Sequence, residues 1–235
     1  MKVGLLFPGL GNQFSAMGKE FYEQSRVVQE YFEEASYCLG INAICLCFTY
    51  SNADFKKKSH EYSALFLMEV AIAQAIKEAK ISVDFVSGRD IGFLGALCAS
   101  GSLSFPDGLY LLSKFLALKE SSPHTDASFI KQYFSKIDIK VPQIPVLSIL
   151  SGMYLSKESD IKDAIVGHLN ELTCDAHGWH KIMEKCLKRD IILISAPAEA
   201  MVEDLKQIYS DKKIIAITHP IDIKRVTKKL RSFSL

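Results

Sequence analysis

The sequence of 235 residues predicts an α/β fold with three layers, α/β/α, around a mainly parallel β-sheet. Short and almost wholly apolar runs alternate along the chain with longer segments whose apolar residues recur at helical spacing. Strands without a polar face are typical of parallel sheets, because helices cover both faces of such sheets. No internal repeat or low-complexity linker interrupts the alternation. We therefore expect residues 1–235 to form one domain.

The first half of the chain predicts two strands and four helices. The apolar run "KVGLLF", Lys2–Phe7, predicts a buried first strand because Pro8 and Gly9 stop it. The spacing "INAICLCFTY" favours an extended segment with Cys45 and Cys47 on one face. We expect a second strand at Ile81–Ser87 and helices at Gly18–Leu39, Tyr62–Ala79, Phe93–Gly101 and Phe105–Glu120, the last one started by Pro106 and Asp107.

The second half repeats this alternation. It predicts strands at Ile144–Leu150, Asp190–Ser195 and Lys212–Thr218. It predicts helices at Ser128–Ile137, Lys157–Leu172, Trp179–Arg189 and Pro197–Tyr209. The strands are short and the helices lie between them, as in a doubly wound sheet.

Composition excludes several classes of function. The formal net charge is +1, which gives no general attraction to nucleic acid or to anionic membranes. No run is long enough to span a membrane, and the apolar stretch at the N-terminus is too short for a signal peptide. The six cysteines are scattered through a chain that needs no disulfides, so we expect reduced thiols in a cytoplasmic protein.

Four segments, in order, carry a resemblance to a known family: "FPGLGNQFSAMGKEFY", "GRDIGFLGALCASGSLSFPDGLYLL", "IPVLSILSG" and the tryptophan Trp179. They resemble the malonyl-CoA:acyl-carrier-protein transacylases and the acyltransferase domains of fatty-acid and polyketide synthases. The resemblance implies an α/β-hydrolase-like core. It also implies a serine at a sharp strand-to-helix turn, which moves an acyl group from coenzyme A to the phosphopantetheine thiol of a carrier protein.

The residues expected to carry this chemistry differ from the family's pattern. The resemblance places the serine at Asp90, the preceding histidine at Arg89 and the following glutamate at Phe93. The arginine that grips the malonyl carboxylate falls at Phe115, with Lys114 beside it. A phenylalanine cannot replace the bidentate guanidinium, so malonyl specificity is in doubt.

The resemblance also implies that a ferredoxin-like subdomain is deleted near 119–124, because only Glu120–Pro123 separate Lys119 from His124. His124 then takes the place of the catalytic histidine. His168 lies near the residue whose backbone orients that histidine. The other groove residues implied are Gln13 and the backbone N–H donors of Leu10 and Ile91.

Three interpretations of Asp90 remain open. Its carboxylate could accept N–H bonds at the start of the helix and fill the old oxyanion site, which is the simplest interpretation. It could act as a nucleophile, although an acyl-CoA brings further negative charge. It could also work with His124 on a water molecule and hydrolyse acyl thioesters.

Two other patterns could carry function. Cys174, His177 and His180 have a spacing that allows zinc ligation, with Cys186 as a fourth ligand, but a polar surface turn is the simpler interpretation and we expect no metal. The basic C-terminal segment His219–Leu235 fits either a helix that meets an acidic carrier protein or an ordinary solvated helix, and we favour the solvated helix.

The sequence therefore leaves two hypotheses. The first is an acyltransferase-like protein with a degenerate active site that binds an acyl carrier protein or a synthase domain as a scaffold. The second is a residual acyltransferase or thioesterase that uses Asp90 and His124. No cofactor is expected, and an acyl-CoA or phosphopantetheine thioester is the candidate ligand. The edge left by the missing subdomain predicts contact with a partner or with a second copy of the chain.

Overall fold

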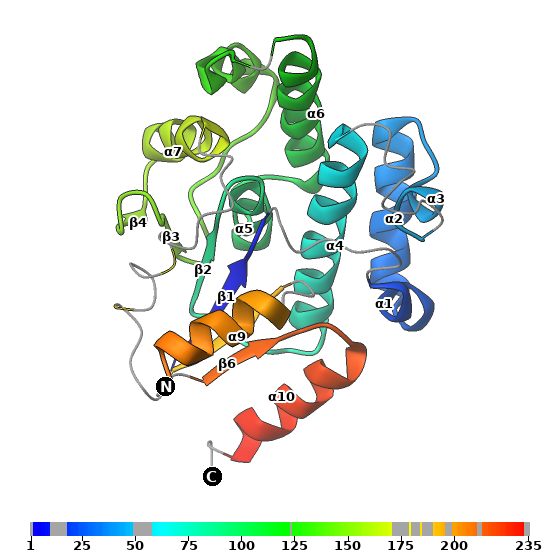
Figure 1. Ribbon diagram of the computed structural model, residues 1–235, viewed down its shortest axis with the longest axis vertical. Helices are drawn as coiled ribbons and strands as arrows, with labels where there is room; N and C mark the ends of the chain where they lie inside the picture. The colour runs from blue at the N-terminus through cyan, green and yellow to red at the C-terminus, as the bar shows by residue number, and fades with distance from the viewer. Residues whose placement is uncertain are drawn as a thin grey trace.

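A computed structural model describes residues 2–9, 18–48, 58–122, 124–170, 179, 184, 190–195, 199–210 and 213–232. Figure 1 shows a central sheet with helices on both sides, as the sequence predicted. The strands are β1 (Val3–Phe7), β2 (Phe85–Gly88), β3 (Val146–Leu147), β4 (Tyr154–Leu155), β5 (Ile191–Ile194) and β6 (Lys213–Ala216). The helices are α1 (Lys19–Gln24), α2 (Arg26–Leu39), α3 (Ala43–Phe48), α4 (Lys58–Glu78), α5 (Gly92–Ser100), α6 (Phe105–Ser121), the 3₁₀ helix η1 (Ala127–Lys136), α7 (Glu158–Asn170), α9 (Glu199–Ile208) and α10 (Pro220–Ser232).

The strand order is β4-β3-β2-β1-β5-β6. All pairs are parallel except β3 with β4, whose short antiparallel turn at the sheet edge the sequence did not predict. The chain first builds the sheet on one side of β1 and then returns to build it on the other. In such sheets ligands bind beyond the carboxyl ends of the strands, where the direction of building reverses. Here that place lies beyond β1, β2 and β5.

The alternating side chains of the central strands divide the core between the two faces of the sheet. Leu5 and Phe7 pack with α2, α4, α5 and α6 in the larger cluster, whereas Leu6 packs with Ile192 and Ile194 in a smaller cluster beneath α9. Because both faces are covered, the strands need no polar side, which explains why they read as continuous apolar runs.

Several predicted elements differ in detail. The predicted helix at Gly18–Leu39 divides at Ser25, whose extended backbone caps α2 and whose Oγ accepts a hydrogen bond from Val28 N. The segment around Cys45 and Cys47 is the helix α3 and not an extended strand, because the side chain of Asn42 accepts from the N–H groups of Ile44 and Cys45. The predicted helix at Trp179–Arg189 lies largely outside the described residues.

Among the described residues, no helix is long and apolar enough to cross a membrane. The described cysteines, Cys38, Cys45, Cys47 and Cys98, are free thiols.

Candidate functional site

The candidate site is the turn between β2 and α5, which lies against the ends of β1 and β5. Arg89 N donates to Phe7 O across the two strands, at 3.1 Å. The turn closes on itself, because Gly92 N donates to Arg89 O at 2.7 Å and Phe93 N donates to Asp90 O at 3.2 Å. The residues Arg89 and Asp90 therefore sit at the carboxyl edge of the sheet, between the first two strands.

Asp90 occupies the tip of this turn in a left-handed backbone conformation, with φ of 42°. Non-glycine residues adopt this region rarely, and examples cluster at functional turns. Glycines make the sharp turn feasible: a Cβ at Gly92 would lie 2.5 Å from Phe7 O, and a Cβ at Gly88 would lie 2.6 Å from Phe93 N. The backbone thus has the form of an elbow that presents one side chain at the start of a helix.

The carboxylate of Asp90 turns back onto its own backbone. It is 1% exposed, and its Oδ1 accepts a hydrogen bond from Ile91 N at 2.6 Å. A Cβ at Gly9 would overlap this oxygen, so the carboxylate also packs against the loop after β1. Its Oδ2 lies 3.4 Å from Nε of Arg89, whose side chain is 9% exposed. The presented side chain is therefore a buried, ion-paired acid.

Glu69 on α4 is a second buried acid beside Asp90. Its side chain is fully buried, and its Oε1 accepts a hydrogen bond from Gly9 N at 2.8 Å. Ser195, just after β5, donates its hydroxyl to the backbone carbonyl of Glu69 at 2.7 Å. Glu69 therefore links α4 to the segments that follow β1 and β5, and it forms part of the buried polar site around Asp90.

Burial raises the pKa of the Glu69 carboxyl well above its ordinary value of 4.5. The hydrogen bond from Gly9 and the charge of Arg89 act in the opposite direction, and the charge of Asp90 raises the pKa further. The raised pKa of Glu69 favours its neutral form, and beside an Asp90–Arg89 pair this reduces the net negative charge of the site. Sequence reasoning missed Glu69, although it is the only charged residue within the apolar run from Tyr62 to Ile76.

His168 on α7 stacks on Phe93 at the first turn of α5, with 3.9 Å between ring centroids and 7° between ring planes. Burial lowers the pKa of this histidine to about 3. Its Nε2 is buried and has no hydrogen-bond partner among the described residues. A neutral imidazole thus packs face to face on the ring that stands where the resemblance expects a glutamate.

The other site residues that the sequence singled out are not gathered around Asp90. His124 is exposed in the turn that follows α6, and no hydrogen bond or ion pair between His124 and Asp90 is found in the described parts of the chain. Phe115 is fully buried in α6 and stacks on Phe129 of η1, with ring centroids 6.4 Å apart. The side chain at this position therefore packs in the core, and it supplies no cation that could bind a malonyl carboxylate.

Four further predicted positions, together with Leu10, lie outside the described residues: Gln13, Cys174, His177 and His180. Within the described residues, no three histidine, cysteine, aspartate or glutamate side chains could together hold a metal ion.

Comparison with known proteins agrees with this architecture. No protein-family profile matches the chain. The malonyl-CoA–acyl-carrier-protein transacylase of a polyketide pathway in Bacillus velezensis, BaeC, is 30% identical over 229 residues, which cover 94% of this chain and 65% of the relative. A transacylase of Bacillus subtilis is 36% identical over 113 residues, which cover 48% of this chain and 36% of the relative. The chain thus matches less than two thirds of the length of these relatives.

The crystal structure of the Streptococcus pneumoniae transacylase superposes with a TM-score of 0.83 and 16% identity, over 97% of this chain and 100% of that chain. The chain is similar in sequence to these transacylases over part of their length, and it has the fold of the solved transacylase structure. A second solved structure contains a malonyl-transacylase in complex with the acyl-carrier protein of a type II polyketide synthase. It superposes with a TM-score of 0.86 and 16% identity, over 97% of this chain and 100% of that chain.

Proposed function

We propose that this protein belongs to the acyltransferase family and is a non-catalytic binding module that recognises an acyl carrier protein. The observation that carries the proposal is the hydrogen bond from Ile91 N to Asp90 Oδ1. The resemblance makes that N–H a donor to the oxyanion of an acyl intermediate. Because Ile91 N already donates to the buried carboxylate of Asp90, it is not available to bind an oxyanion. The negative charge of Asp90 would also repel the charge of an oxyanion.

Three neighbouring groups support the same conclusion. Arg89 is paired with Asp90 and so neutralises the acid instead of a substrate. Phe115 supplies no cation for a malonyl carboxylate. His124 is exposed and makes no hydrogen bond to Asp90, so a general base is not in place at the turn. We infer further that the short connection from α6 to η1, residues 122–126, marks the deleted subdomain, which would otherwise form one wall of the acyl groove.

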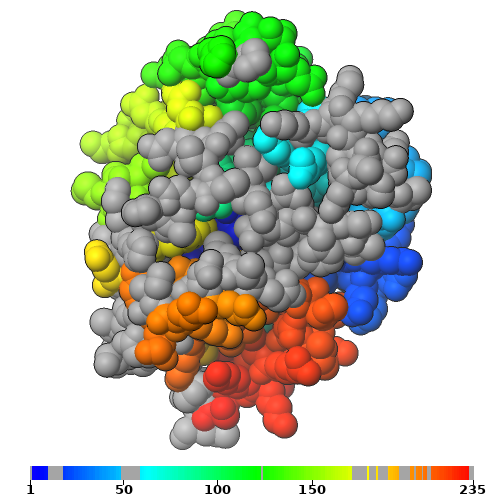
Figure 2. Space-filling view, in the orientation of Figure 1, coloured from blue at the N-terminus to red at the C-terminus, as the bar shows by residue number. Residues whose placement is uncertain are grey.

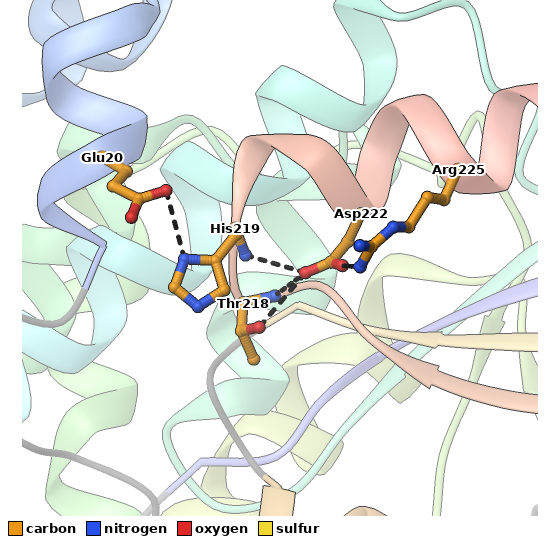
Figure 3. Close-up of polar contacts among 5 residues, drawn as sticks. All are labelled: Glu20, Thr218, His219, Asp222 and Arg225. Atoms are coloured by element: carbon orange, nitrogen blue, oxygen red, sulfur yellow. Dashed lines mark hydrogen bonds and ion pairs between the residues drawn. The ribbon is translucent and has the colours of Figure 1, made fainter.

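A basic face of α10 is the surface that we assign to the carrier protein. Asp222 fixes the start of this helix, because its Oδ2 accepts from Thr218 N, Thr218 Oγ1 and His219 N, and His219 Nδ1 lies 3.2 Å from Glu20 Oε2 on α1 (Figure 3). Beyond this anchored end most of the exposed side chains are cationic. Four of them form no ion pair in the described part of the chain: Lys224, Lys228, Lys229 and Arg231.

This helix forms the surface at the lower end of the face shown in Figure 2. Because the whole chain has a formal net charge of only +1, the cations of α10 form a local field and not a general one. Such a field attracts an acidic protein surface and increases its association rate.

Intact-protein mass spectrometry tests the absence of catalysis. We expect no acyl adduct and no release of CoA when the protein is incubated with malonyl-, acetyl- or octanoyl-CoA. An active transacylase from the same family serves as the positive control. The variant Asp90→Ser restores a hydroxyl at the elbow and measures whether the groove still admits a thioester.

Release of CoA by the unchanged protein that disappears in His124→Ala would overturn the proposal. It would instead favour an acyltransferase or thioester hydrolase that works through Asp90 and His124. The preserved elbow conformation of Asp90 is the observation that makes this alternative worth testing.

A further inference from the structure

A cavity lies at the edge of the sheet opposite to Asp90. Its volume is about 340 Å³, and its walls include the segments that enter β2 and β3 and the ends of α4 and α5. Asp90 follows the carboxyl end of β2, whereas this cavity is bounded by Ile81 and Val83 before β2 and by Ile144 before β3. Asp90 and the cavity therefore lie at opposite edges of one sheet. A ligand in this cavity would be separate from the function proposed for the turn at Asp90.

Small residues create this space where α4 and α5 face each other. Ala73 of α4 and Ala99 of α5 line the cavity, and Gly101 ends α5 in a left-handed conformation with φ of 77°. A side chain at Gly101 would meet Gln143, since its Cβ would lie 3.2 Å from Cδ of that residue. Larger side chains at these positions would close the cavity.

The interior of the cavity is apolar. Its deep walls are the buried side chains Leu5, Val70, Ile76 and Val86. The hydroxyl-bearing ring of Tyr31 also lines it, and burial raises the pKa of that phenol, so the group stays neutral. Such walls favour an apolar ligand body, because burying it removes apolar surface from water.

The polar groups of the lining are mostly exposed. Ser82 and Gln143 are exposed and Gln74 is half-buried, and Lys77 supplies the single cation of the lining. Lys77 is exposed and takes part in no ion pair with the described residues. It lies in the last turn of α4, where backbone carbonyls give the helix end a partial negative charge. That partial charge opposes an anion, so the single cation Lys77 can offset one negative charge but not a dianion such as phosphate.

We propose that this cavity binds a small monocarboxylate with an unbranched apolar body, with the carboxylate at Lys77 and the body between α4 and α5. A volume near the lower end of the range for ligand pockets limits the ligand to a short chain. The side-chain amides of Gln74 and Gln143 belong to the same lining and can donate hydrogen bonds to the second carboxylate oxygen.

Isothermal titration calorimetry with octanoate, 1-octanol and octylammonium tests the assignment, because the three probes share one apolar body and differ in charge. We expect saturable binding in the order octanoate, octanol, octylammonium. An exposed ion pair contributes little to affinity, so Lys77→Gln should weaken octanoate binding by about 1.4- to fivefold and leave octanol binding unchanged. The matched control is Lys80→Gln, which removes an exposed cation near the same helix end but outside the lining.

A second variant tests the place of the apolar body. Ala99→Leu keeps a helix-forming residue and fills the cavity, so it should abolish binding of both octanoate and octanol. Equal binding of octanoate and octylammonium, or an unchanged octanoate affinity in Lys77→Gln, would overturn the carboxylate assignment. The absence of saturable binding by any probe, or binding that survives Ala99→Leu, would overturn the cavity as the site. None of these readouts depends on acyl transfer, so the result is independent of the test at Asp90.

Discussion

His168 is a buried imidazole whose protonation the fold opposes. Its folded pKa of about 3 lies below the ordinary value of 6.5, so the unfolded chain binds a proton between these values more readily than the folded chain. The stability that neutral His168 contributes is present above pH 6.5 and is lost as the pH falls towards 3. The slope from this one group reaches up to about 1.4 kcal/mol per pH unit.

We expect His168→Leu to remove this acid sensitivity. Urea unfolding at pH 7.5, 6.0 and 5.0 should give variant and unchanged protein free energies of unfolding within about 1 kcal/mol at pH 7.5, because the imidazole Nε2 has no described partner to lose. The variant should then become relatively more stable as the pH decreases. His124→Leu, which removes an exposed imidazole, is the matched control. A constant difference at all three pH values would contradict the prediction.

Of the two buried acids in the candidate site, the sequence identified Asp90 but not Glu69. Asp90 was identifiable because the glycines around it match a strand–turn–helix motif. Glu69 lies 21 positions earlier, where it is the only charged residue of the apolar run Tyr62–Ile76, and only the fold brings it to the same turn. A lone acid in a buried helix indicates a buried polar partner, but the sequence does not indicate which loop supplies it.

Among the elements, α6 depends on a local cap that the sequence marks clearly. Ser104 Oγ accepts a hydrogen bond from Asp107 N at 3.1 Å and donates one to Asp107 Oδ2 at 2.7 Å. These two bonds cap the N-terminus of α6. We expect Ser104→Ala to lower the free energy of unfolding by about 1 kcal/mol, measured by urea titration. Ser113→Ala, within the same helix, is the matched control and should be nearly neutral. Equal effects of the two substitutions would contradict the capping role.

The elements that the sequence misassigned are short. α3 has only six residues, and its alternating cysteines matched a strand pattern as well as a helix. Over so few residues periodicity cannot separate the two, and the cap at Asn42 decides the outcome. The edge strand β4 has two residues and follows a turn, which leaves no periodic signal at all. The long apolar helix α4 and the strands at the sheet centre were predicted because their patterns are long or continuous.

For the whole molecule, the charge of α10 leads to a prediction about partners. Reversal of two of its cations in the double variant Lys228→Glu/Arg231→Glu should weaken binding of an acidic acyl carrier protein about tenfold at low salt and reduce the dependence of binding on salt. The double variant Lys140→Glu/Lys157→Glu changes the net charge equally at exposed positions outside α10, and it should change binding little. Surface plasmon resonance at two salt concentrations measures both. Equal losses in the two variants would indicate a response to net charge alone.

At this scale the sequence predicted the layers and the parallel sheet but not the strand order. The alternation of strands and helices along the chain predicts that helices cover the sheet. The strand order depends instead on which strands pair with β1 on each side, and the alternation does not contain that information. The candidate site followed from the elbow motif in the same way. The hydrogen bond from Ile91 N to Asp90 Oδ1 agrees with the simplest interpretation of Asp90 in the sequence, whereas the approach of Glu69 to the same turn depends on packing that no spacing encodes.

The pairing of β1 with both β2 and β5 has a consequence for the order in which the protein forms during synthesis. Val3–Phe7 is synthesised long before one of its neighbours, Ile191–Ile194. Until that neighbour is made, the central strand has an unpaired edge, and the pairing must close the long loop formed by residues 8–190. Nascent chains that stop before residue 191 should therefore expose an apolar strand. Such a strand is prone to aggregation and can be bound by ribosome-associated chaperones.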